Sequence, residues 1–143
     1  MDPGFAESYS NLGVLLWDSG ELDSALEQLN KAAQLSPDHP DVIYNIAMIY
    51  AQLGQAKQAI DVLKHYLSSR PDDFDAKVYL SILLLENGAE SEGLTHLEEV
   101  LENDPENEEA LKVGTQLQDA VDTTEDEEGP TQEDGPAQAE AGT

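Results

Sequence analysis

Proline and glycine recur along this chain at one constant interval. Proline occupies Pro3, Pro37, Pro71 and Pro105, and glycine occupies Gly20, Gly54 and Gly88. Three further columns share the interval, one of leucine and two of small residues: Leu29, Leu63 and Leu97; Ala25, Ala59 and Gly93; Gly13, Ala47 and Ser81. A period of about 20–50 residues indicates a repeat architecture, in which each unit buries its apolar face against its neighbours.

Each repeat is expected to form two helices that pack into a hairpin. In the first unit, apolar residues recur at helical spacing in two stretches: Tyr9, Leu12 and Leu16, then Leu22, Leu26 and Leu29. Gly20 separates the stretches, and glycine ends helices because it adopts the left-handed conformation without steric cost. Pro37 stops the second helix near residue 35, because proline cannot continue a helix. The columns of small residues let the two helices approach closely.

This pattern resembles the tetratricopeptide repeat, in which an aromatic, Leu-Gly, Tyr, Ala, an aromatic or Leu, and Pro follow in order over roughly 34 residues. The corresponding residues are Tyr9, Leu12, Gly13, Leu16, Ala25, Leu29, Ala32 and Pro37; Ile43, Ile46, Ala47, Tyr50, Ala59, Leu63, Tyr66 and Pro71; and Lys77, Leu80, Ser81, Leu84, Gly93, Leu97, Val100 and Pro105. The third unit matches least well, because Lys77 replaces the aromatic and Gly93 replaces alanine. The resemblance covers residues 5–107 and implies an all-α fold, a right-handed α-solenoid of three hairpins.

The same register predicts the organisation of the chain. Residues 6–121 are expected to form the repeat domain, with units 6–39, 40–73 and 74–107 and a capping helix over 108–121 that carries Leu111 and Leu117. Residues 1–5 are interpreted as the end of a preceding repeat, because Asp2-Pro3 matches the unit ends. The chain is then either a fragment of a longer array or a protein that starts at a repeat boundary. Residues 122–143 are expected to be a disordered acidic tail, since they have too little apolar surface to offset the entropy of ordering.

Charge narrows the range of partners. Against 31 Asp and Glu the chain has six Lys and Arg, a net charge of −25, and residues 1–118 still hold −16. Nucleic acid and anionic membrane surfaces are excluded, because both need clustered basic residues. A strongly acidic, lysine-poor surface is typical of a halophilic protein, and an ordinary acidic repeat protein is the alternative. With no signal peptide and no apolar stretch long enough to span a bilayer, a cytoplasmic location is expected.

The sequence offers no catalytic or metal-binding constellation, so we expect no enzyme activity and no cofactor. There are no cysteines, and no histidine has another at metal-ligand spacing. Asp72, Asp73 and Asp75 resemble a calcium loop at first sight, but Lys77 and Val78 stand where an oxygen ligand and the central glycine belong. These acids are better explained as helix caps and first-turn charges.

One face of each first helix is unusually apolar for a surface turned away from the hairpin partner. The resemblance implies that this face lines a concave groove for an extended or helical peptide, for which we select eight residues: Asn11, Val14, Trp17, Tyr44, Asn45, Met48, Tyr79 and Ile82. Asn11 and Asn45 resemble the asparagine ladder by which some of these grooves hold a peptide backbone. The alternative is that these side chains pack between neighbouring first helices. Glu7, Asp41 and Asp75 form an acidic column beside them.

The family's clamp for the acidic C-terminal tails of heat-shock chaperones uses Lys, Asn, Asn, Lys and Arg. The corresponding residues are Ser10, Val14, Asn45, Asp75 and Tyr79, of which only Asn45 agrees. We therefore expect a protein or peptide partner that is not such a tail. The leading interpretation is a non-enzymatic protein-interaction module. The alternatives are a self-assembling scaffold, in which the apolar face or the N-terminal edge docks another copy, and a non-catalytic segment of a larger protein.

Overall fold

The computed structural model describes residues 3–128, so the expected tail residues 129–143 lie outside the described part of the chain. The described residues form helices and no strand, as the sequence predicts. In chain order the helices are α1 (Pro3–Asp18), α2 (Leu22–Leu35), α3 (Pro40–Gln52), α4 (Ala56–Ser69), α5 (Phe74–Glu86), α6 (Glu90–Asn103) and α7 (Glu108–Glu128). The chain divides into two compact units after Pro105, with α1–α6 in the first and α7 in the second.

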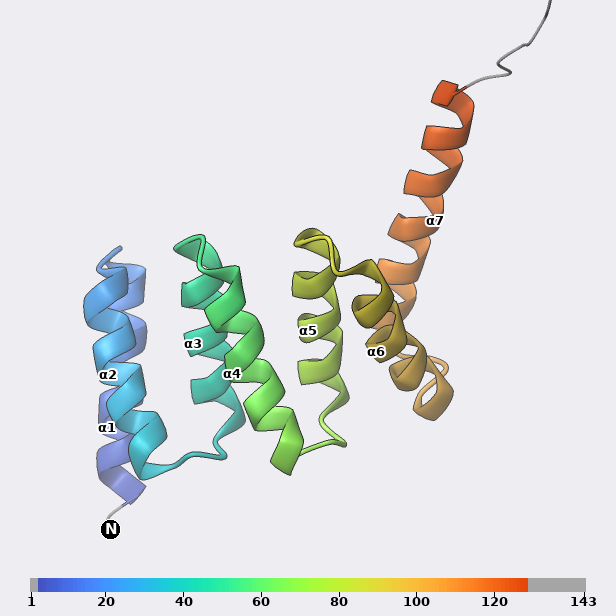
Figure 1. Cartoon of the computed structure of the whole chain (residues 1–143). Helices are drawn as coiled ribbons and strands as arrows, with labels where there is room; N and C mark the ends of the chain where they lie inside the picture. The colour runs from blue at the N-terminus through green and yellow to red at the C-terminus, as the bar shows by residue number, and fades with distance from the viewer. Residues whose placement is uncertain (1–2, 129–143) are drawn as a thin grey trace, which may run out of the picture. The chain divides into compact units, whose positions relative to one another are not determined.

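The first unit is a solenoid of three helical hairpins, α1–α2, α3–α4 and α5–α6, which follow one another side by side (Figure 1). Each hairpin turns at one of the periodic glycines. Gly20, Gly54 and Gly88 have φ values of 83°, 76° and 83°, the left-handed region that only glycine enters without strain. The periodic glycines are therefore the turns inside the hairpins, and Pro37 and Pro71 lie in the connections between hairpins.

The columns of small residues lie where the two helices of a hairpin approach closely. A Cβ atom on Gly13 would lie 2.6 Å from the Cγ atom of Leu29, which is completely buried. In the third hairpin the small residue is on the second helix, where a Cβ on Gly93 would lie 2.8 Å from Cγ of Leu85. The buried Ser81 hydroxyl donates a 2.6 Å hydrogen bond to the Gly93 carbonyl oxygen. The third unit thus departs from the repeat pattern and keeps the close crossing.

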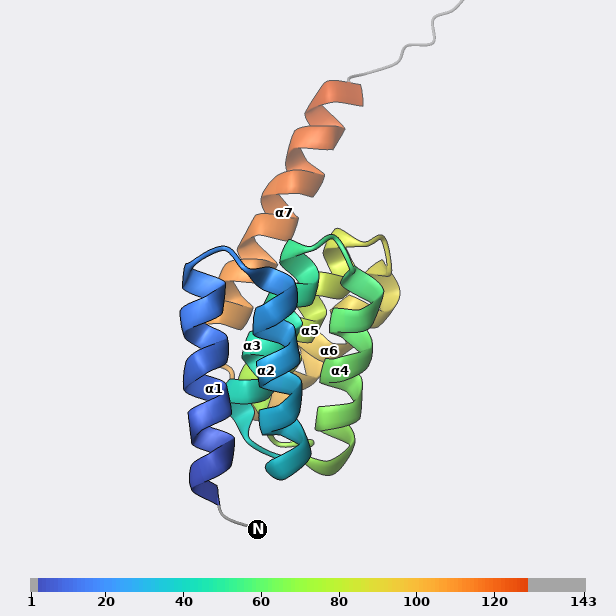
Figure 2. The same cartoon turned by 90° about the vertical axis from the view of Figure 1, so that its left-hand side faces the viewer.

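One expectation about the hairpin core is wrong, and stacking explains why. The helical pattern predicts that Leu12 packs within its hairpin, yet it is 44% exposed, whereas Ile46 and Leu80 in the same column are 2% and 1% exposed. Ile46 packs in a cluster with residues of α2, and Leu80 in one with residues of α4. This column therefore contacts the preceding hairpin. Among the described residues no hairpin precedes α1, so Leu12 is left exposed with Phe5 and Leu15. The first hairpin, α1–α2, is the one nearest the viewer in Figure 2.

Both ends of the described chain also differ from expectation. Helix α1 begins at Pro3, so residues 3–5 are part of the first helix. Proline suits the first turn of a helix, where its missing N–H has no partner to lose. Helix α7 runs past residue 121 to Glu128. A helix satisfies its backbone locally and Glu is a good helix former, so a lack of apolar surface does not stop it. Local bonds within α7 include those from Gln118 to Asp122 and from Thr123 to the Asp119 carbonyl.

Candidate functional site

The eight selected residues lie at equivalent positions on three first helices: Asn11, Val14 and Trp17 on α1; Tyr44, Asn45 and Met48 on α3; Tyr79 and Ile82 on α5. We call this surface the groove face. Asn11 and Met48 are exposed, and the other six are half-buried. The groove face is therefore neither a fully solvated surface nor a closed core. This intermediate burial is compatible both with a peptide-binding groove and with packing between neighbouring first helices.

The polar ends of two groove aromatics are used inside the protein. The Trp17 indole N–H donates a 2.8 Å hydrogen bond to Oε1 of Gln52, which links α1 to α3. The Tyr44 hydroxyl donates a 2.8 Å bond to Oδ1 of Asp73, which links α3 to the start of α5. These two hydrogen bonds stabilise the stacking of consecutive first helices.

Asp73 is the centre of a polar network in the connection between the second and third hairpins. We call this connection, residues 70–73, the second junction. Asp73 caps α5 by accepting a 3.0 Å bond from the Ala76 amide, and its Oδ2 accepts a 2.7 Å bond from the buried Tyr66 hydroxyl. With Tyr44, three donors from three helices converge on one carboxylate. The expectation that this acid is a helix cap is confirmed.

The network shifts the pKa values of its members in the directions that charge and burial dictate. Burial alone would raise the pKa of Asp73, but the bonds from Tyr66, Ala76 and Tyr44 outweigh it and hold that pKa below its usual value. Burial and the bond to Asp73 raise the pKa of Tyr66 to about 12, and the same two causes raise that of Tyr44 further. At neutral pH the network therefore consists of one carboxylate and two neutral phenols.

The connection between the first and second hairpins has different side chains at the same positions. We call residues 36–39 the first junction. The counterparts of Tyr44, Tyr66 and Asp73, each one repeat earlier, are Ser10, Ala32 and His39. Instead of a network, the structure has a cavity of 370 Å³ beside this junction. Its lining comes from α1, the junction and α3: Ala6, Glu7, Ser10, Asn11, Ser36, His39, Asp41 and Val42.

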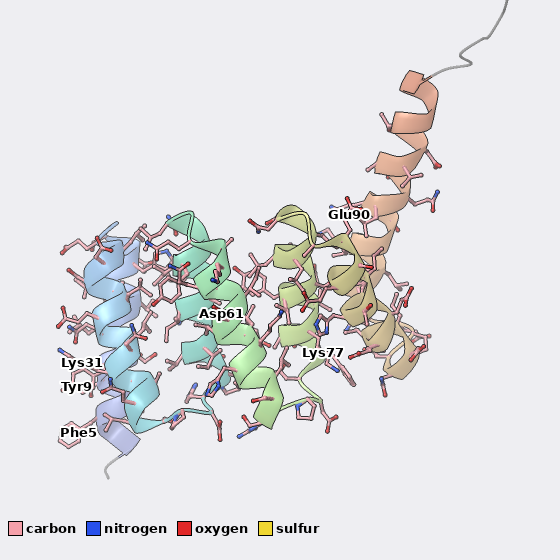
Figure 3. The ribbon with its side chains drawn as sticks, in the orientation of Figure 1. Phe5, Tyr9, Lys31, Asp61, Lys77 and Glu90 are labelled. Carbon is pink, nitrogen blue, oxygen red and sulfur yellow. The ribbon has the colours of Figure 1, made fainter. Side chains whose placement is uncertain are left out.

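Negative charge on the first helices is not balanced by basic residues. Helices α1, α3 and α5 carry five acids: Glu7, Asp18, Asp41, Asp75 and Glu86. Their one basic residue is Lys77, which Figure 3 labels. Its ammonium lies 2.8 Å from a carboxylate oxygen of Glu99 in α6. That hydrogen bond lowers the pKa of Glu99. Because Lys77 is paired across its own hairpin, the first helices present carboxylates without an opposing cation.

Sequence reasoning missed the partners of the aromatics and part of the cavity lining. Gln52, Ser36 and the three-donor network at Asp73 are not among the residues selected above. The repeat register contained a signal for this network. Ser10 stands one repeat before Tyr44, and His39 one repeat before Asp73, so both members of this pair are replaced in the first unit. Among residues 3–128 there is no cluster of three potential metal ligands. None of the helices in this range combines the length and apolarity that crossing a bilayer requires.

Comparison with known proteins identifies the family. The family model described as Tetratricopeptide repeat matches residues 16–79 and 54–117, so the chain belongs to this family. Domains of this family generally serve as non-catalytic modules for protein–protein interaction. Solved structures share the fold: the first tetratricopeptide domain of Spaghetti (RPAP3), bound to the HSP90 peptide SRMEEVD, has a TM-score of 0.72 at 21% identity, covering 85% of this chain and 96% of that one. MamA has a TM-score of 0.65 at 23% identity, covering 73% and 61%.

The curated relatives are longer proteins of diverse kinds. The human protein O-mannosyl-transferase TMTC3 is 28% identical over 107 residues, which are 74% of this chain and 12% of the relative. DnaJ homolog subfamily C member 3 of mouse is 28% identical, covering 78% of this chain and 22% of the relative. The repeat-containing protein YpiA of Bacillus subtilis is 30% identical, covering 83% and 28%. The chain thus spans less than a third of each of these relatives.

Proposed function

We propose that the groove face binds a peptide segment of a protein partner, with apolar or aromatic anchors flanked by basic residues. The observation that carries this proposal is the combination, on α1, α3 and α5, of the exposed Met48 and half-buried aromatics with five acids that no basic residue of these helices opposes. Tyr, Trp and Met are favoured at interfaces. Uncompensated carboxylates attract a basic segment and repel an acidic one.

The same charge distribution opposes binding of an acidic C-terminal tail. The peptide SRMEEVD, bound by the Spaghetti domain, has three acidic residues among its last four, two glutamates and a C-terminal aspartate. At the clamp positions this chain has Ser10, Asp75 and Tyr79 where the clamp has Lys, Lys and Arg. The peptide would therefore meet an acid instead of cations. We propose that it is not a ligand of this chain.

The single tryptophan of the chain provides a direct assay. Trp17 lies half-buried on the groove face, so a bound peptide changes its fluorescence. Peptides selected from a random library on the intact chain are titrated, with SRMEEVD as the negative comparison. We expect the selected peptides to be enriched in Lys and Arg, and their affinity to fall as salt screens the attraction. Selection of neutral or acidic peptides would contradict the proposal.

Charge-neutralising variants separate the groove face from the overall charge. Glu7→Gln with Asp41→Asn removes two acids of the column beside the groove face, and Asp61→Asn with Glu90→Gln removes two exposed acids of second helices (Figure 3). Both pairs change the net charge by the same amount. The first pair is expected to lower the affinity for a selected basic peptide about tenfold. The control pair is expected to lower it about twofold or less, because distant charges are screened. Equal losses would show that net charge alone drives binding.

Self-association is a second candidate, favoured by the exposed stripe on the outer side of α1. Phe5, Leu12 and Leu15 are 60%, 44% and 63% exposed, and at 100° per residue the helix's two charged residues lie off this stripe. Two copies could join these stripes without opposing carboxylates. Phe5 points away from α3 at the outer edge of the first hairpin (Figure 3).

Sedimentation of the chain over a wide concentration range tests this candidate. We expect the mass to rise above that of a single chain with concentration, and more so in higher salt, which screens the net charge. Leu15→Glu is expected to hold the chain as a monomer. Leu94→Glu, at a leucine of α6 that is 41% exposed, is the matched control and is expected to leave association unchanged. A native chain that stays monomeric contradicts this candidate.

A further inference from the structure

One side of the cavity at the first junction is formed by Ser10, whose counterpart one repeat later is Tyr44. Ser10 and His39 both line the 370 Å³ cavity. Their counterparts Tyr44 and Asp73 are joined directly, with the phenol of Tyr44 spanning the space between α3 and the start of α5. The second junction also borders a cavity, of 430 Å³, but Tyr44 does not line it and is hydrogen-bonded to Asp73 instead. The Ser10 side of the first cavity therefore corresponds to a position that a tyrosine side chain takes at the second junction.

We propose that the cavity of the first junction binds a tyrosine side chain of the peptide partner, in the way that the Tyr44 ring lies at the second junction. This inference rests on the proposed function of the groove face and names one residue type of its ligand. The ring would lie against Ala6 and Val42, the apolar members of the lining. The hydroxyl would reach His39, since the imidazole ring nitrogen can accept or donate a hydrogen bond.

The flanking acids do not favour a cationic side chain over a phenol at this position. Glu7 and Asp41 flank Ser10 in the register as Asp41 and Asp75 flank Tyr44. The second junction thus holds a phenol between the same pair of acid columns. The two junctions differ because Ser10 and His39 stand at the first where Tyr44 and Asp73 stand at the second. The first junction therefore lacks the aromatic ring and the carboxylate that accepts its hydrogen bond. The basic residues expected in the ligand would then contact the acids at the rim of the cavity.

The sharpest test transplants the second junction into the first. Ser10→Tyr with His39→Asp places the chain's own phenol and carboxylate across the cavity. Ser91→Tyr with His65→Asp makes the same two changes at exposed positions of α6 and α4, and is the matched control. The probes are p-cresol, the analogue of a tyrosine side chain, and n-propylguanidinium, the analogue of arginine. Amide chemical shifts of the ¹⁵N-labelled full chain report where each probe binds.

We expect p-cresol to shift the amides of Ala6, Asn11 and Val42 saturably at millimolar concentration, as is usual for so small a ligand. The transplant should abolish these shifts and the control should retain them. Shifts that persist in the transplant, or no saturable shift in the native chain, would overturn the inference. Preferential binding of n-propylguanidinium at these amides would assign the cavity to a basic side chain instead, and would equally overturn it. If the transplant loses helix content, Ser10→Phe replaces it in this test. The phenylalanine fills the cavity and leaves His39, at the N-cap of α3, unchanged.

Peptide binding separates this inference from the proposed function. For a tyrosine-containing peptide selected on the intact chain, replacing that tyrosine by alanine is expected to weaken binding at least about tenfold, because buried aromatic anchors dominate interface energies. The Ser10→Tyr, His39→Asp variant should bind the unchanged peptide more weakly by the same factor. If peptides bind the groove face and the transplant binds them as tightly as the native chain, the cavity inference fails and the groove stands. If no peptide changes the Trp17 signal, the groove fails, whatever p-cresol does.

Discussion

The two junctions of the first unit share a backbone and differ in their side chains. In both, the first residue donates its N–H four residues back: Ser36 to Ala32 at 2.9 Å and Arg70 to Tyr66 at 3.1 Å. In both, the last residue donates to the first, at 3.3 Å in residues 36–39 and 3.2 Å in residues 70–73. Both junctions border a cavity, of 370 Å³ at the first and 430 Å³ at the second, but the three-donor network is present at the second and not at the first. The repeat fixes the path of the chain, and a few side chains decide whether a junction is tied together by side-chain hydrogen bonds.

Removing the carboxylate from the second junction should have the largest effect. Asp73→Ala deletes a helix cap and leaves the hydroxyl of the buried Tyr66 without its acceptor. We expect a loss of about 3 kcal/mol in the free energy of unfolding, measured by urea denaturation. His39→Ala is the matched change in the first junction, where no side-chain cap bond exists, and is expected to cost less than about 0.5 kcal/mol. Equal losses would show that the two junctions do not differ in energy.

Removing the Tyr66 hydroxyl should cost less than removing the carboxylate. Tyr66→Phe deletes one 2.7 Å bond and leaves Asp73 with two donors. The residue is 3% exposed, so no water replaces the lost donor freely. We expect a loss of about 1.5 kcal/mol in unfolding free energy, because the acceptor is charged. Ala32, its counterpart in the first hairpin, has no hydroxyl to lose. In the Asp73→Ala background the same change should cost almost nothing, and a full loss there would contradict a shared network.

The repeat itself could be predicted from the sequence, because glycine turns, junction prolines and small-residue crossings depend on local sterics. Gly13 and Ser81 lie in the crossing column, as predicted, for that reason. The exposure of Leu12 could not be derived in the same way, since it depends on which hairpin precedes a helix and not on the helix itself. The predicted end of α7 was wrong because apolar content governs packing, whereas a helix can continue on local bonds.

The groove face was predicted at the level of helix faces and not at the level of contacts. Periodicity assigns Tyr44 and Trp17 to one side of their helices. It says nothing of their hydrogen bonds, since Gln52 lies 35 residues from Trp17 and Asp73 lies 29 from Tyr44. Long-range partners of this kind follow from how hairpins stack. The roles of the eight groove residues in binding a ligand remain predictions, which the fluorescence assay tests.

A smaller effect is expected at Tyr44, where the ring is half-buried. Tyr44→Phe removes the 2.8 Å bond to Asp73 and keeps the ring in place. Water can take over part of the lost bond, so we expect about 0.5–1 kcal/mol in unfolding free energy. Ser10→Ala at the first junction, where the hydroxyl borders a cavity, should cost close to zero by the same measurement. A loss above about 2 kcal/mol for Tyr44→Phe would mean that Tyr44 belongs to the core and not to the groove face.

Acid should weaken the second junction by the smallest amount. The pKa of Asp73 is lowered in the folded chain, so its ionisation stabilises the fold above the usual value of 3.8 and ceases to do so as the pH falls through the folded pKa. Asp73→Asn keeps a capping side chain and cannot titrate. The difference in unfolding free energy between native chain and variant should therefore stay constant from pH 7 to about 5 and narrow below 3.8. Other carboxylates titrate in both proteins and cancel. The narrowing is smaller than the Asp73→Ala loss, because a protonated carboxyl still accepts hydrogen bonds from Tyr66 and Ala76. A difference that widens in acid would mean that burial, and not the three donors, dominates at this carboxylate.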